Sequence, residues 1–126
     1  MMKKIISTDK APGAIGPYSQ ATQMGNFIFT SGQLPIDVAT GNLVEADITA
    51  QATKCLENLK ALLEAAGSGM DKVLKTTVFL KDMNDFVAMN DVYKTFFTEN
   101  HPSRSAVQVA RLPKDAMIEI EAIASV

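Results

Sequence analysis

Residues 102–125 read PSRSAVQVARLPKDAMIEIEAIAS, and this stretch decides the fold because it contains two strand-like segments joined by a short connection. We expect strands from Arg104 to Ala110 and from Met117 to Ser125, where aliphatic and small residues are interleaved with polar ones. The first segment opens with Arg104, whose guanidinium never loses its charge. A cation that leads into a buried strand requires a binding partner.

Outward from this stretch, the N-terminal half of the chain predicts a short strand, a hairpin and a helix. The strand is Lys3–Ser7, and the hairpin lies in SQATQMGNFIFTSG, with the turn dipeptide Gly25-Asn26 between its arms. Asp47 is a suitable N-cap for ITAQATKCLENLKALLEAAG, in which apolar residues recur at helical spacing. Gly67 is expected to stop this helix.

The following residues predict another strand and a second helix. KVLKTTVFLKD favours a strand from Lys72 to Lys81. Asn84 is expected to cap the second helix, and Pro102 ends that region. The apolar stripe of the second helix consists of Phe86, Met89, Tyr93 and Phe96.

The resulting order of strand, hairpin, helix, strand, helix, strand and strand predicts an α+β fold with a mixed sheet. Two helices cannot cover both faces of this sheet, yet its strands are apolar on both faces: Phe27 and Phe29 point away from Ile28. In the next strand, regular alternation places Val73 and Phe79 on one face of the sheet and Leu74, Val78 and Leu80 on the other. Burying one such side chain is worth roughly 1.5–3 kcal/mol, so other subunits are expected to cover the second face.

Length, charge and composition exclude several classes of function. The chain has 126 residues, which suits a single domain over residues 1–126. The net charge of −2 and the absence of a basic stripe argue against nucleic-acid binding. We see no signal peptide and no apolar run of membrane length, so we expect a cytoplasmic protein with no membrane partner.

The counts of cysteine and histidine narrow the chemistry further. Cys55 and His101 are the only residues of their types, so they can form neither a protein-only zinc site nor an intrachain disulfide. Cys55 lies on the apolar stripe of the first helix, which is typical of a structural thiol. His101 lies in a loop expected to be exposed, which argues against a serine–histidine triad. We therefore expect no metal and no cofactor.

The remaining candidates are an arginine and a glutamate on the last two strands. Arg104 shares a strand face with Ala106, which leaves space beside the guanidinium for a flat anion. A salt bridge to a local carboxylate is the alternative interpretation. Glu119 and Glu121 lie in the apolar run AMIEIEAIA, either on a solvated face or, for one of them, in a pocket where burial would raise its pKa and suit it to proton transfer.

Two loop segments add hydrogen-bond donors. Tyr18 follows Gly16-Pro17 in a restrained loop, and its neutral phenol can donate a hydrogen bond. Ser31-Gly32 ends the hairpin, where glycine allows close approach of another group to an exposed amide. An ordinary core tyrosine and an ordinary turn are the alternatives. Together these groups suit the binding of a small carboxylate and the positioning of water.

Four segments, GPYSQA, TSGQLPID, VFLKDMNDFVAMNDVY and RSAVQVARLPKDAMIEIEAIA, closely resemble the Rid family of enamine/imine deaminases, also called the YjgF family. The resemblance runs from about Ile15 to Ala124 with the motifs in order. It implies a chorismate-mutase-like α+β subunit with two helices on one face of the sheet. It also implies a homotrimer whose sheets pack inward, with a site at each subunit interface.

The resemblance also implies roles for individual residues. Arg104 would clamp the substrate carboxylate, with Tyr18 and Glu119 as the other catalytic residues. The remaining substrate-binding positions would be Ser31, Gly32, Asn90 and Ala106. Many members of the family carry a cysteine two residues after the arginine, where this chain has Ala106, so a thiol there cannot be needed for its chemistry.

The implied activity is the hydrolysis of 2-imino acids such as 2-iminobutanoate and 2-iminopropanoate to 2-keto acids and ammonia, without a cofactor. One alternative is a non-catalytic protein that binds or senses small carboxylates such as keto acids. Another is a ribonuclease or translation inhibitor, against which the negative charge and the single histidine argue.

Overall fold

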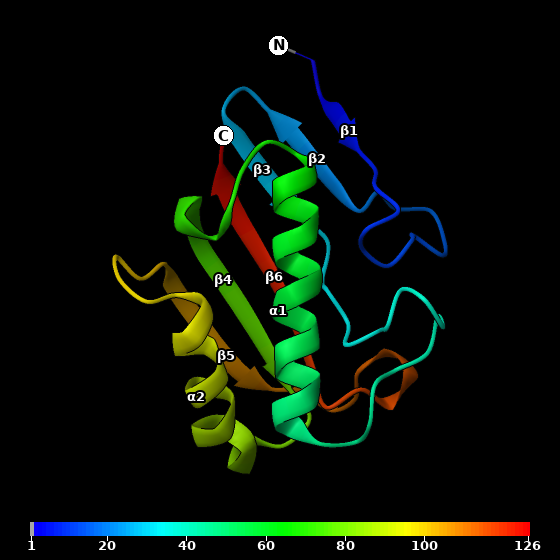
Figure 1. Ribbon diagram of the computed structural model, residues 1–126, viewed down its shortest axis with the longest axis vertical. Coiled ribbons are helices and arrows are strands. Elements are labelled where there is room, and N and C mark those ends of the chain that lie inside the picture. Colours follow the sequence, from blue (N-terminus) through cyan, green and yellow to red (C-terminus); the bar gives the residue numbers. More distant parts are fainter. Residues whose placement is uncertain (1) are drawn as a thin grey trace.

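The computed structural model describes residues 2–126, which form one sheet and two α-helices (Figure 1). The helices are α1 (Ile48–Ala65) and α2 (Phe86–Phe96). The strands are β1 (Lys4–Ile6), β2 (Ala21–Met24), β3 (Phe27–Thr30), β4 (Val73–Leu80), β5 (Ser103–Gln108) and β6 (Ile118–Ser125). This order confirms the predicted succession of elements. No helix within residues 2–126 is long and apolar enough to cross a lipid bilayer.

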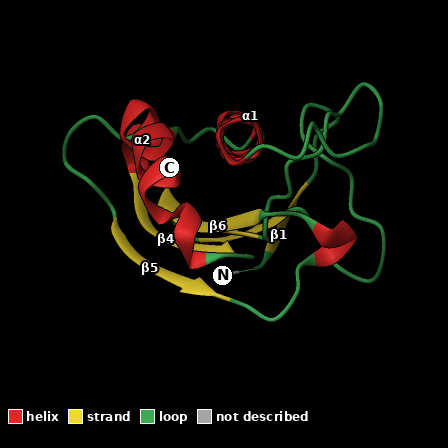
Figure 2. Ribbon diagram, turned by 90° about the horizontal axis from the view of Figure 1, so that it is seen from below, coloured by secondary structure: helices red, strands yellow, loops and turns green. Residues whose placement is uncertain are grey.

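The strands lie in the order β1-β2-β3-β6-β4-β5, and every neighbouring pair is antiparallel except β4 and β5. The parallel pair is connected through α2, as a parallel connection requires a crossover. Figure 2 shows α1 and α2 on the same face of the sheet. The fold is therefore a mixed α+β domain with two helices on one face, as predicted.

Local signals in the sequence explain both ends of α1. The carboxylate of Asp47 accepts a hydrogen bond from the backbone N–H of Ala50 at 2.9 Å, which is the predicted N-cap. At the other end, Gly67 has a φ of +83°, and Ser68 N–H donates to the carbonyl of Leu63 at 2.8 Å. This is the hydrogen bonding of a Schellman motif, which terminates the helix at the predicted glycine.

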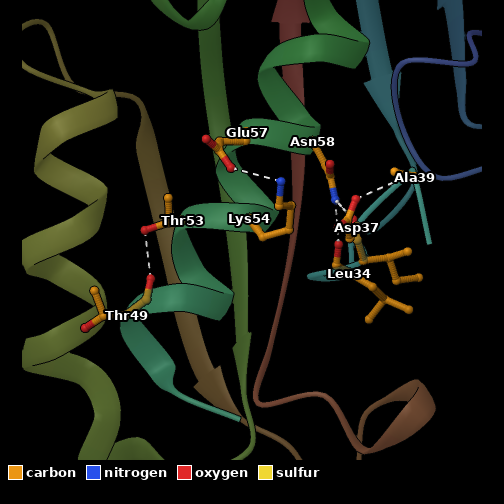
Figure 3. Close-up of polar contacts among 9 residues, drawn as sticks. Leu34, Asp37, Ala39, Thr49, Thr53, Lys54, Glu57 and Asn58 are labelled. Carbon is orange, nitrogen blue, oxygen red and sulfur yellow. Dashed lines mark hydrogen bonds and ion pairs between the residues drawn. The ribbon is translucent and has the colours of Figure 1, made fainter. Parts of the chain in front are cut away.

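A buried asparagine of α1 holds the loop that follows β3. The Asn58 amide donates to the carbonyls of Leu34 and Ile36 at 3.0 and 2.9 Å, as Figure 3 shows for Leu34. Asn58 is buried, and these hydrogen bonds replace those that its amide would form with water in the unfolded chain. They attach the segment after Gly32 firmly to the helix.

The opposite face of the sheet carries apolar side chains without a cover. Phe27 and Phe29 remain 50% and 46% exposed, whereas Ile28 between them is fully buried under the helices. Leu74 and Val107 add further exposed apolar surface. Several large apolar side chains exposed on one face of a sheet are typical of an interaction face.

The predicted division of β4 between the two faces was wrong at its first two residues. Val73 is buried and Leu74 is exposed, the reverse of the arrangement expected from regular alternation. The pairing with β6 shifts register between Val73 and Lys75, so two residues of β4 stand opposite one of β6. This bulge turns Leu74 outward.

Two further predictions need correction. Asn84 does not cap α2: it lies in a short 3₁₀ turn, Met83–Asp85, where the Asp82 carboxylate accepts from Asn84 N–H at 2.9 Å. The strand after Pro102 is not buried, because β5 is the edge strand of the sheet and its outer side chains are exposed.

Candidate active site

Arg104 projects from β5 toward the helices and lies against α2. Its Cα partner on β4 is Thr76, which is fully buried beneath the helices, so Arg104 shares that face. Nη1 of Arg104 donates to Oδ1 of Asn90 at 2.8 Å. The guanidinium carbon lies 4.7 Å from the ring centre of Tyr93 and 5.4 Å from that of Phe86. The structure therefore brings together Arg104 and Asn90, two of the predicted site residues.

No acidic side chain of the protein neutralises Arg104 within residues 2–126. The ion pairs in this part of the chain are Lys54–Glu57, Lys94–Asp91 and Arg111–Asp115. Asn90 is a neutral partner, and Arg104 itself is only partly buried. A hollow of about 590 Å³ opens beside it, and the acid on its walls, Asp91, is paired with Lys94. The guanidinium therefore keeps its positive charge available to an anion from outside the subunit.

Glu119 lies on the uncovered face of β6 and contacts Gly32 closely. The backbone of Gln33 pairs with that of Ile120 through two hydrogen bonds of 2.7 and 3.1 Å, which place Gly32 beside β6. A Cβ atom on Gly32 would overlap the Glu119 carboxylate. Only glycine therefore leaves space for this carboxylate. No acceptor for the Gly32 N–H occurs among residues 2–126.

The surroundings of Glu119 favour its protonated form. Partial burial raises the pKa of its carboxyl, and the nearby charge of Glu121 raises this pKa further. Both glutamates face the same side of β6, but Glu121 borders a separate, smaller hollow with Lys75 and Thr77. Of the two candidates, Glu119 is the one that shares a hollow with Tyr18.

The loop before β2 presents Tyr18 at this second hollow, which has a volume of about 470 Å³. Tyr18 is 51% exposed, and its phenol oxygen accepts a hydrogen bond from Ile15 N–H at 3.3 Å, so its own proton remains free to donate. Ser31 also borders the hollow, but its hydroxyl donates to the carbonyl of Ser19 at 2.6 Å. Ser31 thus ties the Tyr18 loop to the end of β3.

The predicted residues therefore fall into two groups, each in its own hollow. Tyr18, Ser31, Gly32 and Glu119 border one hollow, and Asn90 and Arg104 border the other. Ala106 borders neither: it follows Arg104 on the same side of β5 and is packed partly against the core.

Sequence reasoning missed other residues at the two hollows. Tyr93 was recognised only as part of the apolar stripe, although its spacing of three from Asn90 places both on one side of α2. Lys114 also borders the Tyr18 hollow, and its φ of +58° belongs to a turn that no pattern in the sequence identified. Cys55 is buried, and burial raises the pKa of its thiol well above the usual range, as expected for a structural cysteine.

Comparison with known proteins gives relatives over nearly the whole chain. The family model described as Endoribonuclease L-PSP matches residues 8–126. The 2-iminobutanoate/2-iminopropanoate deaminase of Escherichia coli strain K12 is 56% identical over 126 residues, covering 98% of each protein. A RutC family protein of Pyrococcus abyssi is 56% identical over 124 residues, again covering 98% of each.

Solved structures agree with this relationship. The crystal structure of E. coli TdcF with bound serine matches with a TM-score of 0.93 and 52% sequence identity, covering 98% of both chains. The structure of the E. coli YjgF gene product matches with a TM-score of 0.93 and 54% identity, covering 97% of this chain and 98% of that one. The chain therefore belongs to the Rid (YjgF) family, whose family model is described as Endoribonuclease L-PSP.

Proposed function

We propose that this protein is a cofactor-independent deaminase that hydrolyses short 2-imino acids and their enamine tautomers to 2-keto acids and ammonia. The observation that carries the proposal is the partly exposed guanidinium of Arg104, which no acid of residues 2–126 neutralises and which borders a hollow. A planar guanidinium matches the geometry of a carboxylate. The E. coli relative named 2-iminobutanoate/2-iminopropanoate deaminase supports this class of substrate.

The active unit in this proposal is a chorismate-mutase-like homotrimer, with residues 1–126 forming one Rid-type domain in each subunit. Two observations support it. The uncovered face of the sheet exposes Phe27 and Phe29, and association would bury them at a gain of roughly 25 cal/mol per Å² of apolar surface. The candidate residues also lie in two hollows of one chain, and a neighbouring copy could bring the Arg104 hollow of one subunit to the Glu119 hollow of the next.

The proposed mechanism begins with binding and orientation. The free edge of the Arg104 guanidinium holds the substrate carboxylate, and the N–H of Gly32, which has no acceptor within residues 2–126, adds a second donor. The phenol of Tyr18, whose proton is free to donate, orients the imine end of the substrate. Holding the reacting groups in place supplies most of the acceleration, because a protonated imine is already electrophilic.

Hydrolysis then needs one residue that moves protons. Glu119 takes a proton from water as the oxygen attacks the iminium carbon, which yields a carbinolamine. It returns this proton to the nitrogen and accepts the hydroxyl proton as the carbon–nitrogen bond breaks, so that ammonia and the keto acid form. Glu119 then gives its proton to the ammonia, which leaves as ammonium, and the carboxylate is restored. A carboxyl with a raised pKa is suited to this exchange because both of its forms are populated closer to neutral pH.

The test is an assay coupled to threonine dehydratase, which releases the imine in a buffer without nucleophilic amines. The protein should accelerate decay of the imine, and Arg104→Ala should abolish this acceleration while circular dichroism stays unchanged. Full activity in Arg104→Ala would show that the substrate is held elsewhere.

A second candidate function is the binding of small carboxylates without turnover. The solved relative with bound serine favours it, since serine carries the same carboxylate headgroup. Calorimetry that detects 2-ketobutanoate binding, together with no acceleration in the imine assay, would favour this function over the deaminase.

A further inference from the structure

The Arg104 guanidinium rests on an aromatic ring that is itself anchored. Its carbon lies 4.7 Å from the ring centre of Tyr93, a distance at which a cation is attracted to the face of the ring. Tyr93 is buried, so this ring cannot follow a mobile guanidinium into solvent. Burial outweighs the other influences on Tyr93 and raises the pKa of its phenol, which therefore stays neutral at physiological pH.

The phenol of Tyr93 is held from the sheet. Its oxygen lies 2.7 Å from the hydroxyl oxygen of Thr76, and both side chains are buried. Thr76 is also the residue directly opposite Arg104 in the parallel pairing of β4 and β5. Arg104 on β5 and Thr76 on β4 are therefore direct neighbours: Arg104 carries the guanidinium, and Thr76 anchors the ring that supports it.

Asn90 restrains the guanidinium at a different point. It accepts from Nη1 of Arg104 at 2.8 Å, so one end of the fork is occupied by a neutral side chain of α2. The ring of Tyr93 restrains the plane of the fork, and Asn90 restrains its rotation within that plane. Within residues 2–126, Nη2 and Nε of Arg104 have no hydrogen-bond partner, so this edge of the fork is left for a ligand.

We infer that Tyr93, anchored by Thr76, is a positioning residue that orients Arg104 for a planar carboxylate. The inference rests on the proposed function, because it assigns Tyr93 to the same carboxylate site. A role in packing alone is the competing explanation, since Tyr93 also packs against Phe97, with the rings tilted and their centres 4.6 Å apart. If Tyr93 only packed, replacing it would lower stability and leave the orientation and rotation of the Arg104 guanidinium unchanged.

Nuclear magnetic resonance of the arginine side chains separates these explanations without any substrate. The chain has two arginines, Arg104 and Arg111, and Arg111 is exposed and bound to Asp115, so it serves as an internal reference. With labelled arginine, the Nε–Hε signal of Arg104 should show an upfield ring-current shift and slowed rotation of the guanidinium. Both should weaken clearly in Tyr93→Leu, where only the more distant ring of Phe86 at 5.4 Å remains, and persist unchanged in Phe96→Leu, which removes another ring of α2.

Two milder variants keep the test decisive if Tyr93→Leu does not fold. Tyr93→Phe and Thr76→Val each remove the buried hydroxyl contact and retain a ring over the guanidinium. Each should accelerate rotation of the Arg104 guanidinium with little change in the Arg111 signal. An Arg104 signal identical to wild type in both variants would overturn the inference.

Kinetics give the second readout. Tyr93→Leu should raise KM for the imine about tenfold and change kcat less than about threefold, because the carboxylate is held equally in the ground state and the transition state. Tyr93→Phe should recover most of the lost affinity. An unchanged KM in Tyr93→Leu would also refute the role of Tyr93. If the wild-type protein does not hydrolyse imines, the proposed function fails, and the resonance experiment still tests whether Tyr93 orients Arg104.

Discussion

Arg104 and Glu119 lie on opposite faces of the sheet, on strands that are separated by β4. The Cα partner of Arg104 on β4 is Thr76, buried beneath the helices, whereas Glu119 stands opposite Phe79 on the uncovered face. A small substrate bound to one chain could not reach both side chains. The proposed chemistry therefore depends on how copies of the chain meet.

Arg104 should tolerate no other cation. Replacing it with lysine keeps the charge but removes the planar fork, so Arg104→Lys should lower kcat/KM for the imine at least about 30-fold. Arg111→Lys is the matched control, since Arg111 forms an exposed pair with Asp115, and it should retain wild-type activity. Equal kcat/KM in Arg104→Lys and wild type would mean that charge alone holds the substrate.

Mixing two inactive variants should restore activity. If each site takes Arg104 from one subunit and Glu119 from the next, hybrids of Arg104→Ala and Glu119→Gln chains contain some sites with both native residues. Random assembly from equal amounts should produce such sites in about a quarter of cases. The measurement is imine turnover after the two variants are unfolded and refolded together. Activity no higher than in the separately refolded variants would contradict a shared site.

Gly32→Ala should impair the Glu119 site. The added Cβ would overlap the Glu119 carboxylate, which must then rotate away from its present position. We expect a loss in kcat of about tenfold or more, with a small change in the midpoint of thermal unfolding. Gly13→Ala is the control, because a Cβ at Gly13 meets no atom within 4 Å. A wild-type kcat in Gly32→Ala would show that the present position of Glu119 is not required.

The raised pKa of Glu119 predicts a dependence of stability on pH. Between the ordinary and the raised pKa the folded chain binds more protons than the unfolded chain, so the free energy of unfolding falls as pH rises through this range. Glu119→Gln should remove this part of the pH dependence. Denaturant unfolding across mildly acidic pH measures it, and an unchanged pH profile in this variant would contradict the shift.

A second measurement separates the two causes of this shift. Glu121→Gln removes the neighbouring charge and leaves the burial of Glu119 in place, so the pKa of Glu119 should move part of the way back toward its usual value. Carbon-13 resonances of labelled glutamate report this titration. A Glu119 titration identical to wild type in this variant would mean that burial alone raises its pKa.

The uncovered face of the sheet should control assembly. Phe29→Asp places a charge where a neighbouring sheet is proposed to pack, so light scattering should detect monomers in place of the proposed trimers. Val87→Asp is the control: Val87 lies on α2 and is 71% exposed, so a charge there should leave the assembly intact. A trimer that survives Phe29→Asp would place the interface elsewhere.

Much of the fold could be predicted because its signals act over a few residues. The Asp47 cap, the Gly67 stop and the turn at Gly25-Asn26 each depend on backbone geometry within one turn of chain. The cap predicted at Asn84 was wrong because Asp82 caps a 3₁₀ turn that precedes α2, and α2 itself begins after Asp85 without a side-chain cap. Several polar residues in a row cannot be ranked by propensity alone.

The sequence by itself thus determined the succession of elements, the helix boundaries of α1 and the chemical types of the candidate residues. Only the tertiary structure decided that β5 is an edge strand, that Leu74 turns outward at a bulge, and that Arg104 rests on Tyr93. The tertiary structure also places Arg104 and Glu119 on opposite faces of the sheet. The physical reason is that strand order, register and stacking arise from contacts between segments distant in the chain, and no local pattern encodes which segments meet.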